Sequence, residues 1–273
     1  MTVWQLLFTV WDFYPSVIIG SVALVAAYLW AVYWKPGWRM ALFLAGVGLM
    51  VWALVGALDV LGDDYLFSAH MAQHLILIEA SPPLVLLGTP RQAFDRLLKS
   101  RFVSRAADIL GNPWVAWISA VVVLYAWHIP LLYNAALANE NIHVVEHLFF
   151  LVTATMFWWP ILTPVTERRL DSSMAFLYLM GAGIANTFLG ILIAYVPPQI
   201  YPAYQNPVDE LGILSMIRDQ WGLTRANDQV LGGLLMWIPG GIVYAGAILG
   251  ILARWYAEPD GPDPALSAVD KSA

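Results

Sequence analysis

The sequence predicts an all-α membrane protein, a bundle of seven transmembrane helices. Two observations on composition support this fold class: 60% of the 273 residues are hydrophobic, and only 12% are charged. A typical soluble domain carries about 25% charged residues, so this chain has too few to cover a surface that faces water. The third observation is a series of seven apolar windows, each close to the roughly 20 residues that a helix needs to cross a bilayer.

The seven windows follow one another along a transmembrane domain that spans residues 15–257. Each is predicted to be one membrane-spanning α-helix, because in hydrocarbon a helix satisfies all its own backbone hydrogen bonds. In chain order the predicted helices are Pro15–Trp34, Met40–Leu61, Ser68–Gly88, Pro113–Tyr133, Val144–Leu162, Ser173–Val196 and Val230–Trp255.

The third window is unlike the others, because it contains polar side chains and two prolines. His70 and His74 lie near its start, Glu79 lies near its middle, and Pro82 and Pro83 follow. Proline removes a backbone donor and clashes with the preceding turn of a helix. We therefore expect this helix to kink or break near the prolines.

The segments outside the windows have compositions of their own. Residues 1–14 carry aromatic rings but no Lys or Arg, which predicts a segment lying along the outer membrane interface rather than a cleaved signal. Residues 258–273 are rich in Pro, Asp, Ser and Ala, which predicts a disordered cytoplasmic tail. Within the seventh window, Gly246 and Gly250 form a small-residue pair typical of close helix packing.

The basic residues predict the orientation of the bundle. If the N-terminus lies outside, 11 of the 13 Lys and Arg residues fall on the cytoplasmic side, and only Arg218 and Arg225 fall outside. Cytoplasmic segments of membrane proteins are enriched in Lys and Arg. We therefore expect the N-terminus outside and the C-terminus in the cytoplasm, with the basic loop from Arg91 to Arg105 as a cytoplasmic anchor.

All five histidines fall in the outer half of the membrane in this topology. His70 and His74 are four residues apart at the start of the third window, His143 and His147 have the same spacing at the start of the fifth, and His128 lies near the outer end of the fourth. Residues four apart share one helix face, so the two imidazoles of each pair can bind one metal ion. Because polar groups within a membrane are costly and usually functional, we predict that the five histidines form one metal site.

Three carboxylates are candidates to join or support this site. Glu146 lies between the histidines of the second pair on nearly the same helix face, where it is a ligand or holds an imidazole in place. Glu79 points away from His74 on an ideal helix, so it joins the site only if the third helix bends. Asp228, just before the seventh window, either caps that helix or supports the site.

The kinds of ligand restrict the metal. The chain has no cysteine, so it can form neither a disulfide nor a thiolate site. Imidazole without thiolate suits copper, zinc or iron, and a nearby thioether favours Cu(I). Met71 and Met236 are the candidate thioether ligands, with apolar filler as the alternative interpretation of both. Copper is the expected ion, and zinc, iron and haem are the alternatives.

Several motifs in combination resemble one known family. The motifs are His70-Met-Ala-Gln-His74 with Pro82-Pro83, Trp127-His128-Ile-Pro130, His143-Val-Val-Glu146-His147 and Asp228-Gln229 followed by Met236-Trp237-Ile-Pro239. Over about residues 60 to 255 the chain resembles the CtaG family, integral-membrane assembly factors of bacterial cytochrome c oxidase. The resemblance implies a multi-pass protein of the bacterial plasma membrane that helps copper reach a haem-copper oxidase. The implied partners are the oxidase subunits, membrane lipid and copper donor proteins outside the cytoplasm.

Other classes of membrane protein fit these residues less well. Membrane di-iron oxidoreductases have about eight histidines with an HxxHH box, whereas this chain has five and no such box. A haem protein leaves the paired spacing unexplained, and a transporter is expected to have polar residues across the whole membrane. A stable accessory subunit of the oxidase remains an alternative to the assembly factor. The net charge of −6 argues against a nucleic-acid partner, and we expect a protein without catalytic turnover.

Overall fold

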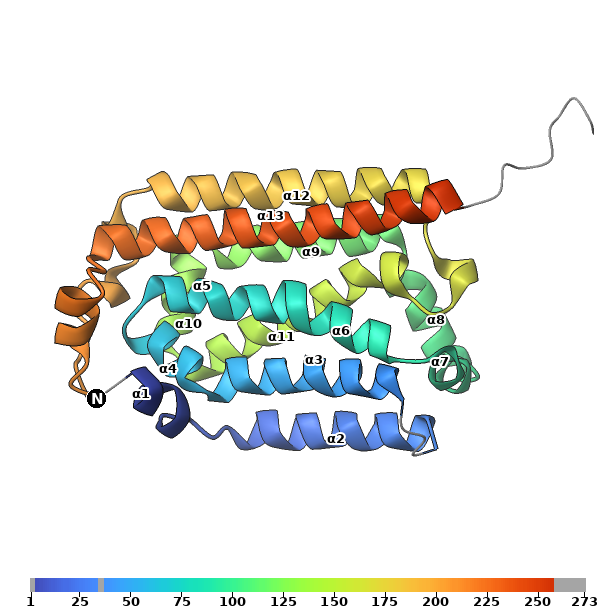
Figure 1. The fold of residues 1–273 in the computed structure, drawn as a ribbon, viewed down its shortest axis with the longest axis horizontal. Helices are drawn as coiled ribbons and strands as arrows, with labels where there is room; N and C mark the ends of the chain where they lie inside the picture. The colour runs from blue at the N-terminus through green and yellow to red at the C-terminus, as the bar shows by residue number, and fades with distance from the viewer. Residues whose placement is uncertain (1–2, 34–36, 258–273) are drawn as a thin grey trace, which may run out of the picture.

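The computed structural model describes residues 3–33 and 37–257, and every regular element within them is a helix. Figure 1 shows the long helices side by side along the longest axis, with α12 (Ser172–Tyr195) and α13 (Arg225–Ala257) at one edge and α2 (Pro15–Ala31) at the other. The elements between these edges include α3 (Trp38–Val55), α5 (Phe67–Leu75), α6 (Ser81–Gly88), α9 (Pro113–Trp127) and α11 (Glu140–Leu162). The predicted all-α class is therefore confirmed for the described part of the chain.

Shorter helices gather at the two ends of this bundle (Figure 1). The end that holds the start of α5 carries α1 (Val3–Thr9), α4 (Ala57–Asp64) and α10 (Pro130–Ala138). The opposite end carries α7 (Arg91–Leu97) and α8 (Arg101–Leu110). The predicted tail, residues 258–273, lies outside the described residues.

Five helices of the described residues are long and apolar enough to cross a membrane. These spans are α3, Phe67–Gly88, α11, α12 and α13, and a sixth is present if α9 and the end of α8, which meet at 68°, count as one bent span. The remaining predicted span, α2, is apolar but only 17 residues long. A multi-pass membrane protein is thus confirmed, while the count of seven and the orientation of the ends stay predictions.

Two predicted helices extend too far at their C-terminal ends. The second was expected to continue to Leu61, but α3 ends at Val55 because Gly56 adopts an extended conformation before α4 begins. Glycine is among the poorest helix formers, which favours a break at this point. The fourth was expected to reach Tyr133, but α9 ends at Trp127. A residue before proline disfavours the helical conformation, and α10 accordingly starts afresh at Pro130.

The third predicted helix does not break at its prolines. A π-helical stretch, Ile76–Ala80, joins α5 to α6, so the helix continues from Phe67 to Gly88. Pro82 has no N–H to offer the carbonyl of Ile78 four residues earlier. The indole nitrogen of Trp158 on α11 donates to that carbonyl instead, at 3.0 Å. A partner from a neighbouring helix therefore satisfies the backbone group that proline leaves without one.

The α12–α13 pair is closely packed, although not at the glycines that the sequence suggested. Gly190 and Gly233 face each other so closely that a Cβ on either would lie 2.6–2.7 Å from the other's carbonyl oxygen. Gly246 and Gly250, by contrast, have nothing within 4 Å of a Cβ position, so the expectation of close packing there is wrong. Asn186 of α12 adds an interhelical hydrogen bond, donating to the carbonyl of Met236 at 2.7 Å.

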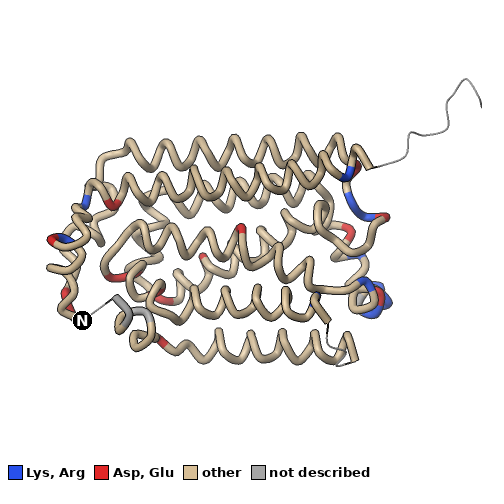
Figure 2. Tube along the Cα trace, in the orientation of Figure 1, with Lys and Arg blue, Asp and Glu red and all other residues tan. Residues whose placement is uncertain are grey.

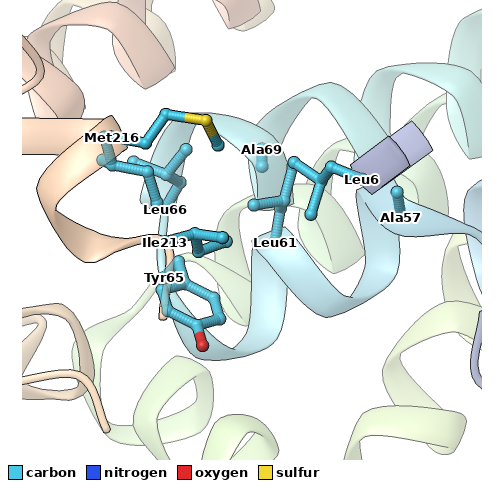
Figure 3. Close-up of a cluster of buried hydrophobic side chains, with 9 residues drawn as sticks. Leu6, Ala57, Leu61, Tyr65, Leu66, Ala69, Ile213 and Met216 are labelled. Atoms are coloured by element: carbon cyan, nitrogen blue, oxygen red, sulfur yellow. The ribbon is translucent and has the colours of Figure 1, made fainter. Parts of the chain in front are cut away.

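The long segment between α12 and α13, residues 196–224, folds over the end of the bundle where α5 begins. It contains short helical turns and contributes buried side chains to one apolar cluster (Figure 3). That cluster consists of Leu6, Ala57, Leu61, Tyr65, Leu66, Ala69, Ile213, Met216 and Ile217. Because Leu6 belongs to it, α1 is packed against this end of the molecule.

Charged side chains divide unequally between the two ends of the bundle. Figure 2 shows Lys and Arg concentrated at the end that carries α7 and α8. Part of this charge is paired there: Arg91 contacts Glu167 at 3.0 Å and Arg168 contacts Asp108 at 2.8 Å. Carboxylates predominate at the opposite end, where α4 carries Asp59, Asp63 and Asp64.

Candidate metal centre

The fold brings all five histidines into one buried cluster. The rings of His70 and His74 on α5 lie 4.3 Å apart between centroids, and those of His143 and His147 on α11 lie 4.1 Å apart. The two pairs face each other, with 5.2 Å from His70 to His143 and 5.7 Å from His74 to His147. His128, at the C-terminal end of α9, lies 5.7 Å from His74. All five are at most 8% exposed.

The helix that carries the first pair is held at its N-terminus by a distant carboxylate. Asp228 in the first turn of α13 accepts hydrogen bonds from the backbone N–H groups of Phe67 and Ser68, at 2.9 and 3.1 Å, and from the Ser68 hydroxyl. The first N–H groups of a helix have no partner within it. Asp228 is therefore a helix cap, but it caps α5 rather than its own helix, and it fixes where His70 and His74 stand.

The helix that carries the second pair begins with a local cap. The side chain of Asn139 accepts hydrogen bonds from the N–H groups of Asn141 and Ile142, at 3.0 and 3.3 Å. This interaction satisfies two of the N–H groups that the start of α11 would otherwise leave free. The first turn of α11 is thus fixed immediately before His143.

Two carboxylates reach the histidines, and only one of them was predicted. The oxygens of Glu146 lie within the cluster, 3.7 Å from Nε2 of His74 at the closest contact. Asp63 at the end of α4 bridges the two pairs, with one oxygen 3.4 Å from Nδ1 of His70 and the other 3.3 Å from Nδ1 of His143. Sequence reasoning missed Asp63, although its place in the short segment before His70 was a usable signal.

A close approach of two backbones places Asp63 beside the histidines. A Cβ on Gly62 would lie 3.0 Å from both Cα and the backbone nitrogen of His70, so only glycine allows α4 to pack this tightly on α5. The carbonyl of Gly62 accepts a hydrogen bond from the Tyr204 hydroxyl at 2.7 Å, and the Tyr133 hydroxyl lies 2.8 Å from that of Tyr204. The Tyr133 ring in turn lies 5.2 Å from the ring of His70. The segment after α12 is thereby tied to the cluster.

Burial and neighbouring charges act in opposite directions on the carboxylates of α4. Burial by itself would raise the pKa of Asp63, but its contacts with His143 and His70 outweigh burial and hold that pKa well below its ordinary value. Burial raises the pKa of Asp59 to about 8, and the negative charge of Asp63 contributes to that rise. Of Asp59 and Asp63, Asp63 is therefore the carboxylate that keeps its charge at neutral pH.

The histidines keep unpaired nitrogens inside the protein. Nε2 of all five is buried without a hydrogen-bond partner, and so are both oxygens of Glu146. Nδ1 of His128 donates to the carbonyl of Leu124 at 2.6 Å, which leaves the lone pair of its Nε2 free. Buried polar atoms are almost always paired. Five such nitrogens in one buried cluster with two carboxylates supply donor types that metal ions bind.

Two overlapping groups in the described residues have metal-site geometry. Asp63, His70 and His143 form the first, and His70, His74 and Glu146 form the second, each with ligand atoms within 4.8 Å of one another. His70 is common to both groups. His147 and His128 lie beside these two groups. The cluster could therefore hold one ion or two.

Three of the predicted candidates lie elsewhere. Met71 and Met236 pack together in an apolar cluster that also contains Phe67 and Tyr133. Glu79 faces α13, where a Cβ on Gly240 would lie 3.0–3.1 Å from its oxygens. Met71 and Met236 therefore have apolar neighbours, and Glu79 is not one of the carboxylates in the two groups of potential ligands.

Comparison with known proteins identifies a family that most of the chain matches. Residues 22–258 match the family model described as cytochrome c oxidase caa3 assembly factor (Caa3_CtaG). Uncharacterised proteins of Mycobacterium bovis and Mycobacterium tuberculosis are each 23% identical over 90% of the chain. The chain spans 39% of the length of these two relatives. No solved structure matches it.

Proposed function

Because the chain belongs to the cytochrome c oxidase caa3 assembly factors, we propose that its histidine cluster binds a copper ion and supplies it to the oxidase during assembly. The observation that carries this proposal is the set of five buried histidines whose Nε2 atoms have no partner in the protein. The role requires binding and release without catalytic turnover.

The spacing of the candidate ligands supports direct metal coordination. Metal–nitrogen and metal–oxygen bonds of about 2.1 Å keep two ligand atoms of one tetrahedral or planar ion within about 4.2 Å of each other. The atoms of each candidate group lie within 4.8 Å of one another. Local side-chain movements that shorten these separations would therefore close either group around an ion.

The chemistry of the donors supports copper among the alternatives. Divalent copper binds imidazole and carboxylate sites more tightly than the other first-row divalent ions. The methionines that would favour Cu(I) lie in the apolar cluster instead. We therefore propose that the bound ion is Cu(II), with zinc as the principal competitor for the same donors.

The distribution of charge supports a site on the outer side of the membrane. The basic end of the bundle, with α7 and α8, fits the cytoplasmic side of a bacterial plasma membrane. The histidine cluster lies toward the opposite end, where α5 begins and residues 196–224 fold over the bundle. In this orientation the ion reaches the site from outside and passes to oxidase subunits that face the same compartment.

Copper retention by the full chain tests the binding role. The tag-free protein in lipid nanodiscs, stripped of metal and dialysed against Cu(II), should hold copper with His74 and His147 intact and lose most of it in His74→Ala and His147→Ala. Met71→Leu is the matched control, because Met71 is buried on the same helix but packs among apolar residues. Thermal unfolding establishes that each variant is folded. Folded histidine variants that retain as much copper as the parent would exclude the site.

A deletion strain grown under copper limitation tests the role in assembly. The strain should contain the oxidase polypeptides and haem but show low oxidase activity, because the copper centre is not filled. A plasmid carrying the parent gene should restore activity, and one carrying His74→Ala should not. Full oxidase activity in the deletion strain would refute an assembly role through copper.

A further inference from the structure

An acidic pocket adjoins the histidine cluster at the end of the bundle where α5 begins. Its volume is about 270 Å³, and it lies between the start of α2, α4, α10 and the first turns of α11. Four carboxylates line it, together with two of the histidines; these residues are Asp59, Asp63, Asp64, Glu140, His143 and His147. No Lys or Arg is among the described residues that line it.

The two groups of potential ligands differ in their relation to this pocket. Asp63 and His143 of the first group line the pocket, while His70 completes the group from behind. His70, His74 and Glu146 of the second group are fully buried and are absent from the lining. The first group is therefore accessible from the pocket, and the second lies deeper.

We propose that the acidic pocket captures a divalent transition-metal cation and that the ion then passes from Asp63, His70 and His143 to His70, His74 and Glu146. This inference rests on the proposed metal-binding function and adds a route and an order of ligands to it. Asp63 is the capture ligand, and Glu146 is the retention ligand.

The transfer is a ligand exchange that requires no redox partner. Bonds from the ion to an Asp63 oxygen and a His143 nitrogen break as bonds to a His74 nitrogen and a Glu146 oxygen form, while His70 stays bound. One carboxylate replaces another, so the charge at the ion is conserved. The rings of His70 and His74 are 4.3 Å apart, and those of His70 and His143 are 5.2 Å apart, so the ion moves by a distance comparable to one ligand spacing.

Unpaired buried atoms mark the pocket as a binding surface. Nε2 of His143 and of His147 and the second oxygen of Asp59 are buried without a hydrogen-bond partner, and all three residues line the pocket. Carboxylates within a concave, low-dielectric wall raise the local concentration of cations and can speed association by about 10- to 1,000-fold. The pocket thus supplies both the attraction and the first ligands.

Aromatic side chains cover the histidine cluster on the side where the segment after α12 packs. Tyr201 and Tyr204, from the segment after α12, pack against Phe67 and Tyr133. Tyr133 is fully buried over His70. Among the described residues, the pocket beside α4 and α11 therefore provides a route to the histidines that these aromatic side chains do not block.

Loading rates of the full chain in nanodiscs of neutral lipid test the capture step. Stopped-flow quenching of the 14 tryptophans by Cu(II) gives association and release rates. Asp64→Asn combined with Glu140→Gln removes two exposed charges from the pocket and should slow association about 10-fold at low salt. The difference should vanish near 1 M salt, where the Debye length is about 3 Å. Glu210→Gln combined with Asp219→Asn is the matched control and should load within twofold of the parent.

Two single variants test the order of the ligands. Asp63→Asn should slow loading at least 10-fold and leave the copper content at equilibrium near that of the parent. Glu146→Gln should load at the parent rate and release copper at least 10-fold faster. A merely structural role for Asp63, in holding the imidazoles, would accelerate release instead of slowing capture.

The outcomes separate this inference from the proposed function. Copper binding by the parent with unchanged loading in the pocket variants and in Asp63→Asn would overturn the capture route and leave the metal site standing. Equal effects of Asp63→Asn and Glu146→Gln on both rates would show a single site and overturn the transfer. A parent chain that binds no copper would overturn the proposed function and this route together.

Discussion

Replacing Asp228 by alanine should weaken both the fold and the metal site, because this carboxylate caps α5 from α13. The substitution leaves the N–H groups of Phe67 and Ser68 without partners, and both residues are at most 5% exposed. An unsatisfied buried group costs about 1–3 kcal/mol, so two of them would cost about 2–6 kcal/mol. Relief from burying the Asp228 charge offsets part of this cost, and the net loss expected is about 2–4 kcal/mol.

The same substitution should reduce copper affinity through position alone. Phe67 and Ser68 form the first turn of the helix that places His70 and His74, so fraying of that turn frees the two imidazoles. Loss of a group that orients a metal ligand typically costs about 10–100-fold in affinity, and we expect a loss in this range. Asp228→Asn keeps one acceptor oxygen and should lose about 1 kcal/mol.

Unfolding of the full chain by SDS titration and equilibrium dialysis with Cu(II) measure the two effects separately. Gln229→Ala is the matched control. The Gln229 side chain donates to the carbonyls of Ile193 and Val196 and so ties α13 to α12, and its loss should cost stability but no copper affinity. The reasoning is refuted if Asp228→Ala is as stable as the parent, or if Gln229→Ala loses as much copper.

Two further predictions concern the ends of the helices. A reporter fused after Ala273 should be active only in its cytoplasmic form, and activity outside would reverse the proposed orientation. Asp171 caps α12, and hydrogen bonds from the Ser173 hydroxyl and the Met174 N–H lower its pKa. Its stabilisation is therefore present above the ordinary carboxyl pKa of about 3.9 and is lost as pH falls through the lowered value. Asp171→Ala should cost about 1 kcal/mol at pH 7 and almost nothing once the pH has fallen below the lowered pKa, and a cost independent of pH would contradict this.

The helical class and the placing of each histidine pair on one helix face could be predicted from the sequence, because both depend on local spacing. A hydrophobic window signals a span by its length, and i,i+4 histidines share a face on any helix. The family resemblance was likewise carried by local motifs such as His143-Val-Val-Glu146-His147, and the match to residues 22–258 confirms it. That these histidines bind metal stays a prediction.

Features that depend on tertiary contacts were beyond the sequence. Asp63 reaches the cluster only because α3 stops at Gly56 and the separate helix α4 packs at Gly62 against His70. Asp228 was recognised as a cap, but its target lies about 160 residues away. The end of α9 at Trp127 was missed because the apolar window continues past Pro130, and composition outweighed the proline in the prediction.

The π-helical stretch Ile76–Ala80 divides one membrane-spanning helix into two segments with different phases. A π turn holds one residue more than an α turn, which shifts everything beyond it by about 100° around the axis. The histidine-bearing segment can therefore face α11 while the following segment seats Gly88 against Phe43 of α3. A homologous chain lacking one residue here would keep a continuous helix but turn its imidazoles out of phase with α6. The length of this stretch is thus as much a part of the ligand geometry as the histidines themselves.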